Sequence, residues 1–230
     1  MKFIGHVIGS GRYRPDERKL DTIMDLSCSI TKRDVKRMLG FFSYFRAYIP
    51  NAAELTHVLS NLITNDKPAR VVWTETEDIA FQQLKQALCD CTRQNLYTIR
   101  YGEPFGVHVD SSKYAVGACL MQWNEDGTER PISFASSKLT GSQLSWAAVQ
   151  KEAYAVVWAL NKFRTWCFGV PIVIYSDSNP LTYLTSNATK SAKLTRWSLA
   201  LQEYNYTFKF RRGTLNVVPA FLSRPCGEME

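Results

Sequence analysis

The hydrophobic pattern of this 230-residue chain changes from a helical to a strand-like period near residues 90 to 104, and this change limits the folds that it can adopt. Before the change, apolar residues recur every three or four positions, as they do on one face of a helix. After it, apolar and polar residues alternate over short segments, as in strands with one face toward a core. The length fits one large domain or two small ones.

Three helices are predicted in the first part of the chain. A capping-box pattern at residues 31–34 begins a helix that Pro50 ends, and a similar pattern at 74–77 begins another. A shorter helix is predicted over residues 55–62. The aromatic residues of the first helix, which lie between 41 and 48, are expected to pack in a core rather than to stack on bases.

The second part of the chain is predicted to form strands at 105–110, 116–123, 131–136, 172–175 and 206–210, and helices at about 144–166 and 192–203. A turn at 124–127 joins the second and third strands as a hairpin. Three consecutive strands followed by helix, strand, helix and strand indicate a mixed α/β sheet with helices packed on it.

Three acidic residues of the second part occupy positions that suggest a metal site. Asp110 and Asp177 each end an apolar strand, and ligand sites in open α/β sheets form outside the ends of neighbouring strands. Glu152 lies three residues after Val149 and four before Val156, on the predicted core-facing side of its helix. A lone carboxylate there is costly unless it is paired or bound to a metal.

Each of these carboxylates also has a structural explanation when it is taken alone. A strand-end Asp often forms a turn, and a Glu in the first half of a helix interacts with the helix dipole. Together, however, the three predict a site for Mg²⁺, or alternatively Mn²⁺, because hard oxygen ligands suit such ions. Two ions of this kind can activate water and stabilise the leaving oxygen in phosphodiester hydrolysis.

The positive charge of the chain is concentrated near its C-terminal end. The net charge is +7, and residues 190–224 hold only one acidic residue, Glu203, against seven basic residues: Lys190, Lys193, Arg196, Lys209, Arg211, Arg212 and Arg224. A basic stripe of this kind neutralises phosphates and predicts a nucleic-acid partner. The alternative is a solvated surface that only aids solubility.

The sequence indicates an intracellular chain with no membrane partner. No apolar run approaches the length of a membrane span, and the first residues do not form the apolar core of a signal peptide. The six cysteines form no pair with the usual zinc-ligand spacing, so free thiols are expected.

Several motifs resemble those of reverse transcriptases from gypsy-type long-terminal-repeat retrotransposons. Residues 3–8 are similar to the segment that leaves the polymerase palm, residues 39–50 to the thumb helix and residues 73–85 to the connection. Residues 109–112, 151–159 and 175–181 resemble three ribonuclease H motifs, and residues 200–204 and 216–224 resemble the end of that domain. The motifs cover nearly the whole chain in the family order.

The resemblance implies a fold and a division of the chain. It implies an α/β, RNase H-like domain over residues 104–224, with a mixed five-stranded sheet and flanking helices. Before this domain it implies a remnant of the palm–thumb junction at 1–24 and a small, mainly helical thumb and connection region at 25–103. Residues 225–230 would form a tail.

The resemblance also implies a function. The RNase H-like domain would hydrolyse the RNA strand of an RNA–DNA hybrid, with Asp110, Glu152 and Asp177 as catalytic and metal-binding carboxylates. Contacts with the hybrid or another nucleic acid are expected from Ser111, Ser112, Asn179, Arg196, Arg211 and Arg212.

The sequence departs from the family pattern in two places. No Tyr-x-Asp-Asp motif is present, so DNA synthesis is not expected of this chain alone, and a polymerase portion that acts in trans is a candidate partner. Where the family has a fourth catalytic Asp, this chain has Ala220, and Phe221 adds bulk beside it. No acidic residue lies between Glu203 and Glu228 to replace the missing one. We therefore expect impaired hydrolysis; the alternatives are a non-catalytic nucleic-acid-binding remnant and a purely structural one.

Overall fold

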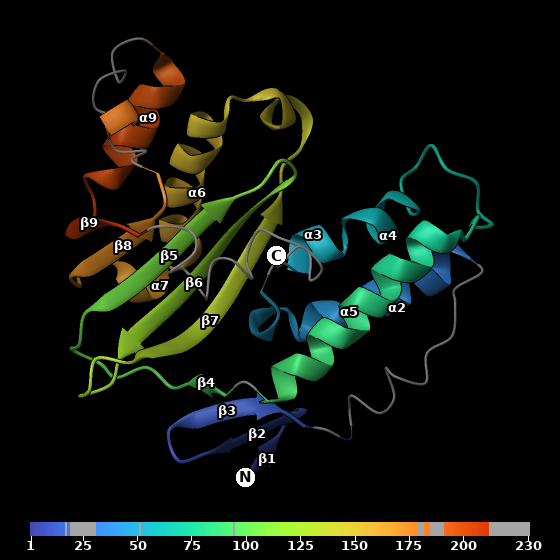
Figure 1. The fold of residues 1–230 in the computed structure, drawn as a ribbon, viewed down its shortest axis with the longest axis horizontal. Helices are drawn as coiled ribbons and strands as arrows, with labels where there is room; N and C mark the ends of the chain where they lie inside the picture. Colours follow the sequence, from blue (N-terminus) through green and yellow to red (C-terminus); the bar gives the residue numbers. More distant parts are fainter. Residues whose placement is uncertain are drawn as a thin grey trace.

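The computed structural model describes residues 1–16, 18, 31–50, 52–93, 95–178, 182–184 and 191–211. These residues form a five-stranded sheet, a four-stranded sheet and helices that pack on them (Figure 1). The smaller sheet holds the N-terminus and lies at one end of the larger sheet, at the bottom of Figure 1.

The larger sheet has the strand order β7-β6-β5-β8-β9. Its strands are β5 (Phe105–Ser111), β6 (Ala115–Trp123), β7 (Glu129–Lys138), β8 (Ile172–Ser176) and β9 (Tyr206–Phe210). The first three are antiparallel neighbours, whereas β8 runs parallel to β5, and β9 runs parallel to β8. Helices α6 (Ala148–Lys162) and α7 (Arg164–Cys167) connect β7 to β8, and α9 (Ala192–Leu201) precedes β9. The predicted mixed five-stranded sheet with flanking helices is therefore confirmed.

Both faces of this sheet are buried, and each faces a different core. Successive side chains of a strand point to opposite faces. Ala118 and Leu120 belong to a core shared with α6, whereas Cys119 and Phe134 belong to a second core shared with the N-terminal helices. As a result, every position of β6 except Trp123 is buried. The sheet is the common wall between the two parts of the chain.

The first part of the chain contains more strands than the sequence predicted. Its elements are β1 (Lys2–Phe3), β2 (His6–Gly9), β3 (Arg12–Pro15), α2 (Lys32–Tyr44), η1 (Arg46–Tyr48), α3 (Ala52–Leu55), α4 (His57–Asn61), α5 (Glu75–Arg93) and β4 (Leu96–Tyr97). Strands β1 to β4 form the smaller sheet, in which Tyr13 of β3 pairs with Leu96 of β4. The predicted segments 1–24 and 25–103 thus share one sheet, and the division between them stays a prediction.

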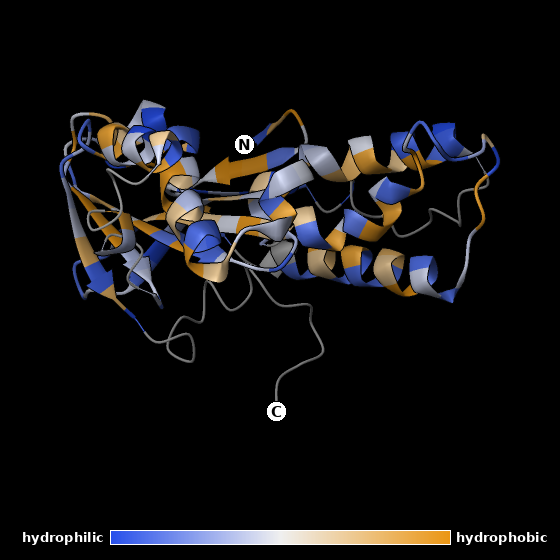
Figure 2. Ribbon diagram, turned by 90° about the horizontal axis from the view of Figure 1, so that it is seen from above, coloured by the Kyte–Doolittle hydropathy of each residue, from blue (hydrophilic) through white to orange (hydrophobic). Residues whose placement is uncertain are grey.

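The N-terminal helices are amphipathic, as their sequence period predicted, and Figure 2 shows their orange and blue stripes. The predicted capping box is present, because Thr31 Oγ1 accepts a hydrogen bond from Asp34 N and Asp34 Oδ2 accepts one from Thr31 N. Phe42, Phe45 and Tyr48 are buried in the core, as expected, whereas Tyr44 is 46% exposed, so the expectation is wrong for that residue. None of the described helices combines the length and apolar character needed to cross a membrane.

The helix predicted at 144–166 is interrupted in the structure. It consists of a 3-10 helix, η2 (Gly141–Ser145), followed by α6 and α7. The extended backbone of Trp146 separates η2 from α6, and Phe163 ends α6. Val149 therefore lies in the first turn of α6 and is 36% exposed, so its prediction as a core-facing residue is wrong.

Substitution of Gly106 tests how tightly the side chains of β5 and β6 pack. A Cβ atom at this position would lie 2.9 Å from Met121 Cγ, and Met121 is only 1% exposed. We expect Gly106→Val to lower the free energy of unfolding by about 1–3 kcal/mol, because the buried side chain has no room to move away. Urea denaturation measures this change.

Gly40→Ala is the matched control. Gly40 lies on the exposed side of α2, and no atom lies within 4 Å of an added Cβ. Alanine there should be neutral or stabilise the protein by up to about 1 kcal/mol through its helix propensity. Equal stability of Gly106→Val and the unsubstituted chain would contradict the described packing.

Candidate metal site at the ends of two parallel strands

The parallel pairing of β5 and β8 brings two of the predicted carboxylates together. His108 of β5 pairs with Tyr175 of β8, so Asp110 and Asp177, each two residues further on, lie at the same edge of the sheet. Asp110 is the penultimate residue of β5, and Asp177 directly follows β8. This is the strand-end position that favours ligand binding in open sheets.

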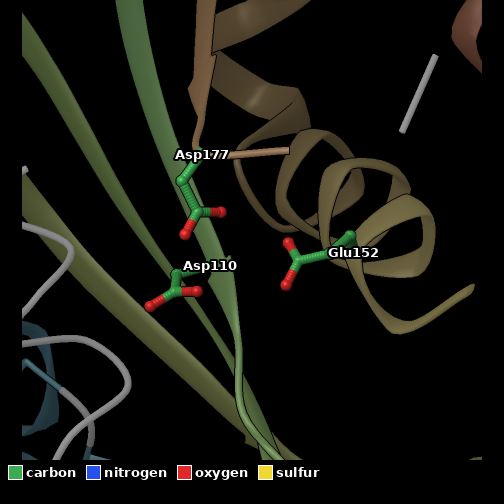
Figure 3. A group of neighbouring side chains, drawn as sticks. All are labelled: Asp110, Glu152 and Asp177. Carbon is green, nitrogen blue, oxygen red and sulfur yellow. The ribbon is translucent and has the colours of Figure 1, made fainter. Parts of the chain in front are cut away.

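Glu152 of α6 completes the cluster, and Figure 3 shows its side chain directed toward the two aspartates. One carboxylate oxygen from each of the three residues lies within 4.8 Å of the others. The helix is held over the sheet by buried residues such as Ala153 and Val156. The three carboxylates that the sequence singled out therefore meet, as a metal site requires.

Hydrogen bonds hold the side chains of this cluster. Ser111 Oγ donates to Glu152 Oε1 at 2.6 Å, and the backbone N–H of Ser111 donates to Asp110 Oδ1 at 2.7 Å. The buried Oε2 atom of Glu152 has no hydrogen-bond partner among the described residues. Burial, followed by repulsion from Asp110 and Asp177, raises the pKa of Glu152 to about 8.

This environment fits a bound cation. The three carboxylates, of which Glu152 has an unsatisfied buried oxygen, present only hard oxygen ligands, and this is the donor set that Mg²⁺ or Mn²⁺ binds. Without a cation, the negative charges repel one another, and Glu152 holds its proton more tightly.

The structure also buries an acidic residue of the N-terminal part that the sequence analysis did not single out. Glu54 lies on α3, far from Asp110 in the sequence, and its Oε2 is buried without a hydrogen-bond partner among the described residues. Burial is the main cause that raises the pKa of Glu54 to about 7, and the negative charge of Asp110 adds to it. The only local signal is an acidic residue within the apolar run Ala52-Ala53-Glu54-Leu55.

The predicted substrate contacts fall into three groups. Ser111 lies within the cluster, and Ser112 is in the turn that follows it. Arg196 is exposed on α9, whereas Arg211 forms an ion pair with Glu129, 82 residues away. Asn179, Arg212 and the predicted fourth carboxylate position, Ala220, lie outside the described residues.

Comparison with known proteins identifies the family of the domain that carries this cluster. Residues 100–204 match the family described as the RNase H-like domain found in reverse transcriptase. The chain is 31% identical over 97% of its length to the retrovirus-related Pol polyprotein from transposon opus and 32% identical over 97% to that from transposon 412, both of Drosophila melanogaster. It therefore contains an RNase H-like domain of the reverse transcriptase type found in retrotransposon Pol polyproteins, as its motifs predicted.

The relatives are much longer than this chain. It covers 23% of the opus polyprotein, 18% of the 412 polyprotein and 17% of the transposon Tf2-3 polyprotein of Schizosaccharomyces pombe, to which it is 29% identical over its whole length. The chain thus spans about a fifth of the length of these relatives.

Solved structures share the fold of both parts of the chain. The foamy viral protease–reverse transcriptase bound to double-stranded DNA has a TM-score of 0.78 and 22% identity, over 92% of this chain and 37% of that one. The same viral protein bound to an RNA/DNA hybrid has a TM-score of 0.76 and 21% identity, over 97% of this chain and 30% of that one. At these identities the likeness shows the fold alone.

The raised pKa of Glu152 predicts how pH affects the metal-free protein. The folded state holds the proton up to about pH 8, whereas the unfolded chain releases it near the ordinary value of 4.5. Stability therefore falls as the pH rises between these two values, because the folded state then binds more protons than the unfolded state. Glu152→Gln removes this pH-dependent loss of stability. The difference in melting temperature between this variant and the unsubstituted chain should therefore grow in favour of the variant from pH 5 to pH 8.

Thermal melts in a chelating buffer measure this difference, at roughly 2–4 °C per kcal/mol for a chain of this size. Glu125→Gln is the control, since Glu125 is exposed in the hairpin turn. A pH-independent difference for Glu152→Gln would contradict the described electrostatics.

Proposed function

We propose that this chain is part of a gypsy-type retrotransposon reverse transcriptase whose RNase H-like domain hydrolyses the RNA strand of RNA–DNA hybrids. The observation that carries this proposal is the convergence of Asp110, Glu152 and Asp177 within 4.8 Å at the ends of two parallel strands. The family match of residues 100–204 supports the proposal. So does the foamy viral protease–reverse transcriptase, which has the same fold and was solved in complex with an RNA/DNA hybrid.

In this proposal Asp110, Glu152 and Asp177 hold Mg²⁺ or Mn²⁺. When bound, such an ion supplies Lewis-acid activation of water and stabilises the leaving oxygen of the phosphodiester. Ser111 restricts Glu152 by its hydrogen bond, so that the carboxylate is already directed toward the two aspartates. Glu152 must release its proton to act as a ligand, and its raised pKa makes this step depend on pH near neutrality.

The nucleic acid in this proposal is held by basic residues outside the metal site. Arg196 offers an exposed guanidinium for a phosphate, and Arg212 follows it in the same basic stripe of the sequence. Arg211 is already paired with Glu129, so we assign it a smaller share of the binding free energy. A polymerase portion of the longer polyprotein would act together with this segment.

We expect a reduced rate of hydrolysis because Ala220 stands where the family pattern has a fourth Asp. Without the fourth Asp, the site has one anionic ligand fewer than the family pattern, and this weakens the binding of a second ion. The second candidate function is a non-catalytic module that binds nucleic acid, and Ala220 is the observation that favours it.

Cleavage of a labelled RNA–DNA hybrid with Mg²⁺ or Mn²⁺ tests the proposal. We expect slow cleavage by the unsubstituted chain, loss of at least about 100-fold with Asp110→Asn, and faster cleavage with Ala220→Asp, because the added carboxylate restores a metal ligand. If only Ala220→Asp cleaves, the unsubstituted chain is a binding module. If neither chain cleaves, the enzymatic proposal is wrong.

Salt dependence tests hybrid binding separately from catalysis. Phosphate contacts release counterions, so the logarithm of the association constant should fall steeply with the logarithm of salt concentration. Arg196→Ala should reduce this slope by about 1 if its guanidinium contacts a phosphate. Lys162→Ala, at the opposite end of α6 from Glu152, is the charge-matched control and should leave the slope unchanged. A slope near zero for the unsubstituted chain would exclude phosphate binding.

A further inference from the structure

A cavity of about 480 Å³ lies where the N-terminal part of the chain meets the outer strand of the larger sheet. Its walls come from the end of α2 and η1, from residues 133–137 of β7, and from the C-terminal end of α6 together with α7. Strand β7 forms one edge of the sheet in Figure 1. The volume falls in the range of pockets that bind small molecules, about 300–1,000 Å³.

This cavity is separate from the carboxylate cluster. Glu152 lies in the second turn of α6, whereas Lys162, which lines the cavity, is the last residue of that helix. The ten residues between these positions correspond to about 15 Å of helix. None of the three clustered carboxylates lines the cavity. A ligand bound here therefore leaves the proposed metal site free.

The charge around the cavity is positive. Arg46 and Lys162 are the charged residues of its lining, and none of the described acidic residues belongs to it. Within the described part of the chain, neither cation forms an ion pair with a carboxylate. Arg46 donates to the backbone carbonyl of Ser136, but a guanidinium has five N–H donors, so others remain for a ligand. The lining therefore favours an anion.

One wall of the cavity is aromatic. Trp158 and Trp166 line it and are partly buried against the core shared with α6. The Trp166 ring also contacts that of Phe163, with centroids 6.2 Å apart, and Phe163 is only 1% exposed. The two indoles are thus held in place by a packed core. Their remaining exposed surface suits a flat ring, because aromatic faces stack on such rings.

Short side chains on the other elements leave room for a ligand. Ala47 of η1 and Ser133 and Ala135 of β7 line the cavity, and none of them can fill it. The position of β7 against the N-terminal part is fixed, since the backbone N–H of Ala53 donates to Ser136 Oγ at 2.9 Å in a buried hydrogen bond. The cavity is therefore formed before a ligand binds, which lowers the entropic cost of binding.

We propose that this cavity binds a nucleotide, with the phosphate at Arg46 and Lys162 and the base against Trp158 and Trp166. The two cations require an anion and the indoles require a flat ring, and a nucleotide carries both. Serine hydroxyls of the lining can hydrogen-bond to the sugar or to the edges of the base. A free nucleotide and the unpaired end of a nucleic-acid strand share this chemistry. The inference does not depend on a bound metal.

The experiment titrates AMP into the full chain and follows the indole N–H signals of Trp158 and Trp166 by NMR in a chelating buffer. Each signal is assigned by its loss in Trp158→Phe or Trp166→Phe. Adenosine lacks the phosphate and ribose phosphate lacks the base, so these two probes separate the two halves of the ligand. The chelating buffer keeps the outcome independent of the proposed metal site, and thermal melts establish that each variant is folded.

We expect AMP to shift both indole signals. Adenosine should bind about 10-fold more weakly, because it makes no charged hydrogen bond, and ribose phosphate at least about 5-fold more weakly, because it does not stack. Lys162→Gln should weaken AMP binding by about 10-fold. Lys209→Gln is the charge-matched control and should leave binding unchanged, since Lys209 is exposed on β9, at the opposite edge of the sheet.

The aromatic wall has a matched pair of variants as well. Trp166→Leu should weaken AMP binding by about 5-fold or more through the loss of a stacking surface. Phe168→Leu should leave binding unchanged, because Phe168 is 55% exposed two residues further on and does not line the cavity.

A short single-stranded oligonucleotide and a blunt RNA–DNA hybrid distinguish the two sources of the nucleotide. If the oligonucleotide shifts the indole signals at a lower concentration than AMP, the cavity holds the end of a strand. If AMP acts at the lower concentration, a free nucleotide is the ligand. The blunt hybrid should leave both indole signals unchanged, because its bases are stacked inside the duplex.

Unchanged indole signals throughout the AMP titration would overturn the inference. Equal weakening by Lys162→Gln and Lys209→Gln would also overturn it, because AMP would then respond only to the net positive charge of the chain. Ribose phosphate that binds as tightly as AMP would exclude the proposed role of the indoles, and with it a nucleotide site.

Discussion

The parallel pairing of β5 with β8 is the constraint on which the candidate site depends. It places Asp110 and Asp177 at one edge of the sheet, where their charges repel each other and that of Glu152. The fold tolerates this repulsion because the strands and α6 are fixed by an apolar core on the other side of the cluster. The unfavourable charge is therefore local, and a cation can relieve it without rearranging the sheet.

The second constraint is that the sheet has no solvent-facing side over most of β6. One face packs on α6, and the other packs on helices of the N-terminal part, so polar residues there must find partners inside the protein. Ser136 does so with Ala53 and Arg46. These contacts connect the position of α3 to β7, which pairs with β6 and through it with the strand that carries Asp110.

The sequence predicted those features that depend on local pattern. The order of strands and helices, the capping box at Thr31 and the convergence of Asp110, Glu152 and Asp177 all follow from periodicity and from strand ends. The exposure of Val149 was missed because the helix start was placed before Trp146.

Features that depend on contacts between distant residues could not be predicted in this way. The pairing of Tyr13 with Leu96 joins strands too short to show a period of their own. The partner of Arg211, Glu129, lies 82 residues away, so this interaction has no signature within a sequence window. Local reasoning therefore found the three carboxylates of the candidate site but not the contacts between distant parts of the chain.

The shared core has a consequence for how such a segment can be inherited. Cys119 and Phe134 of the sheet are covered by N-terminal helices rather than by the RNase H-like domain itself. A recombination event that exchanged only residues 100–204 would leave this face against unrelated side chains and lose complementary packing. The unit that keeps this packing intact is accordingly larger than residues 100–204, and substitutions on α3 and β7 are expected to evolve together.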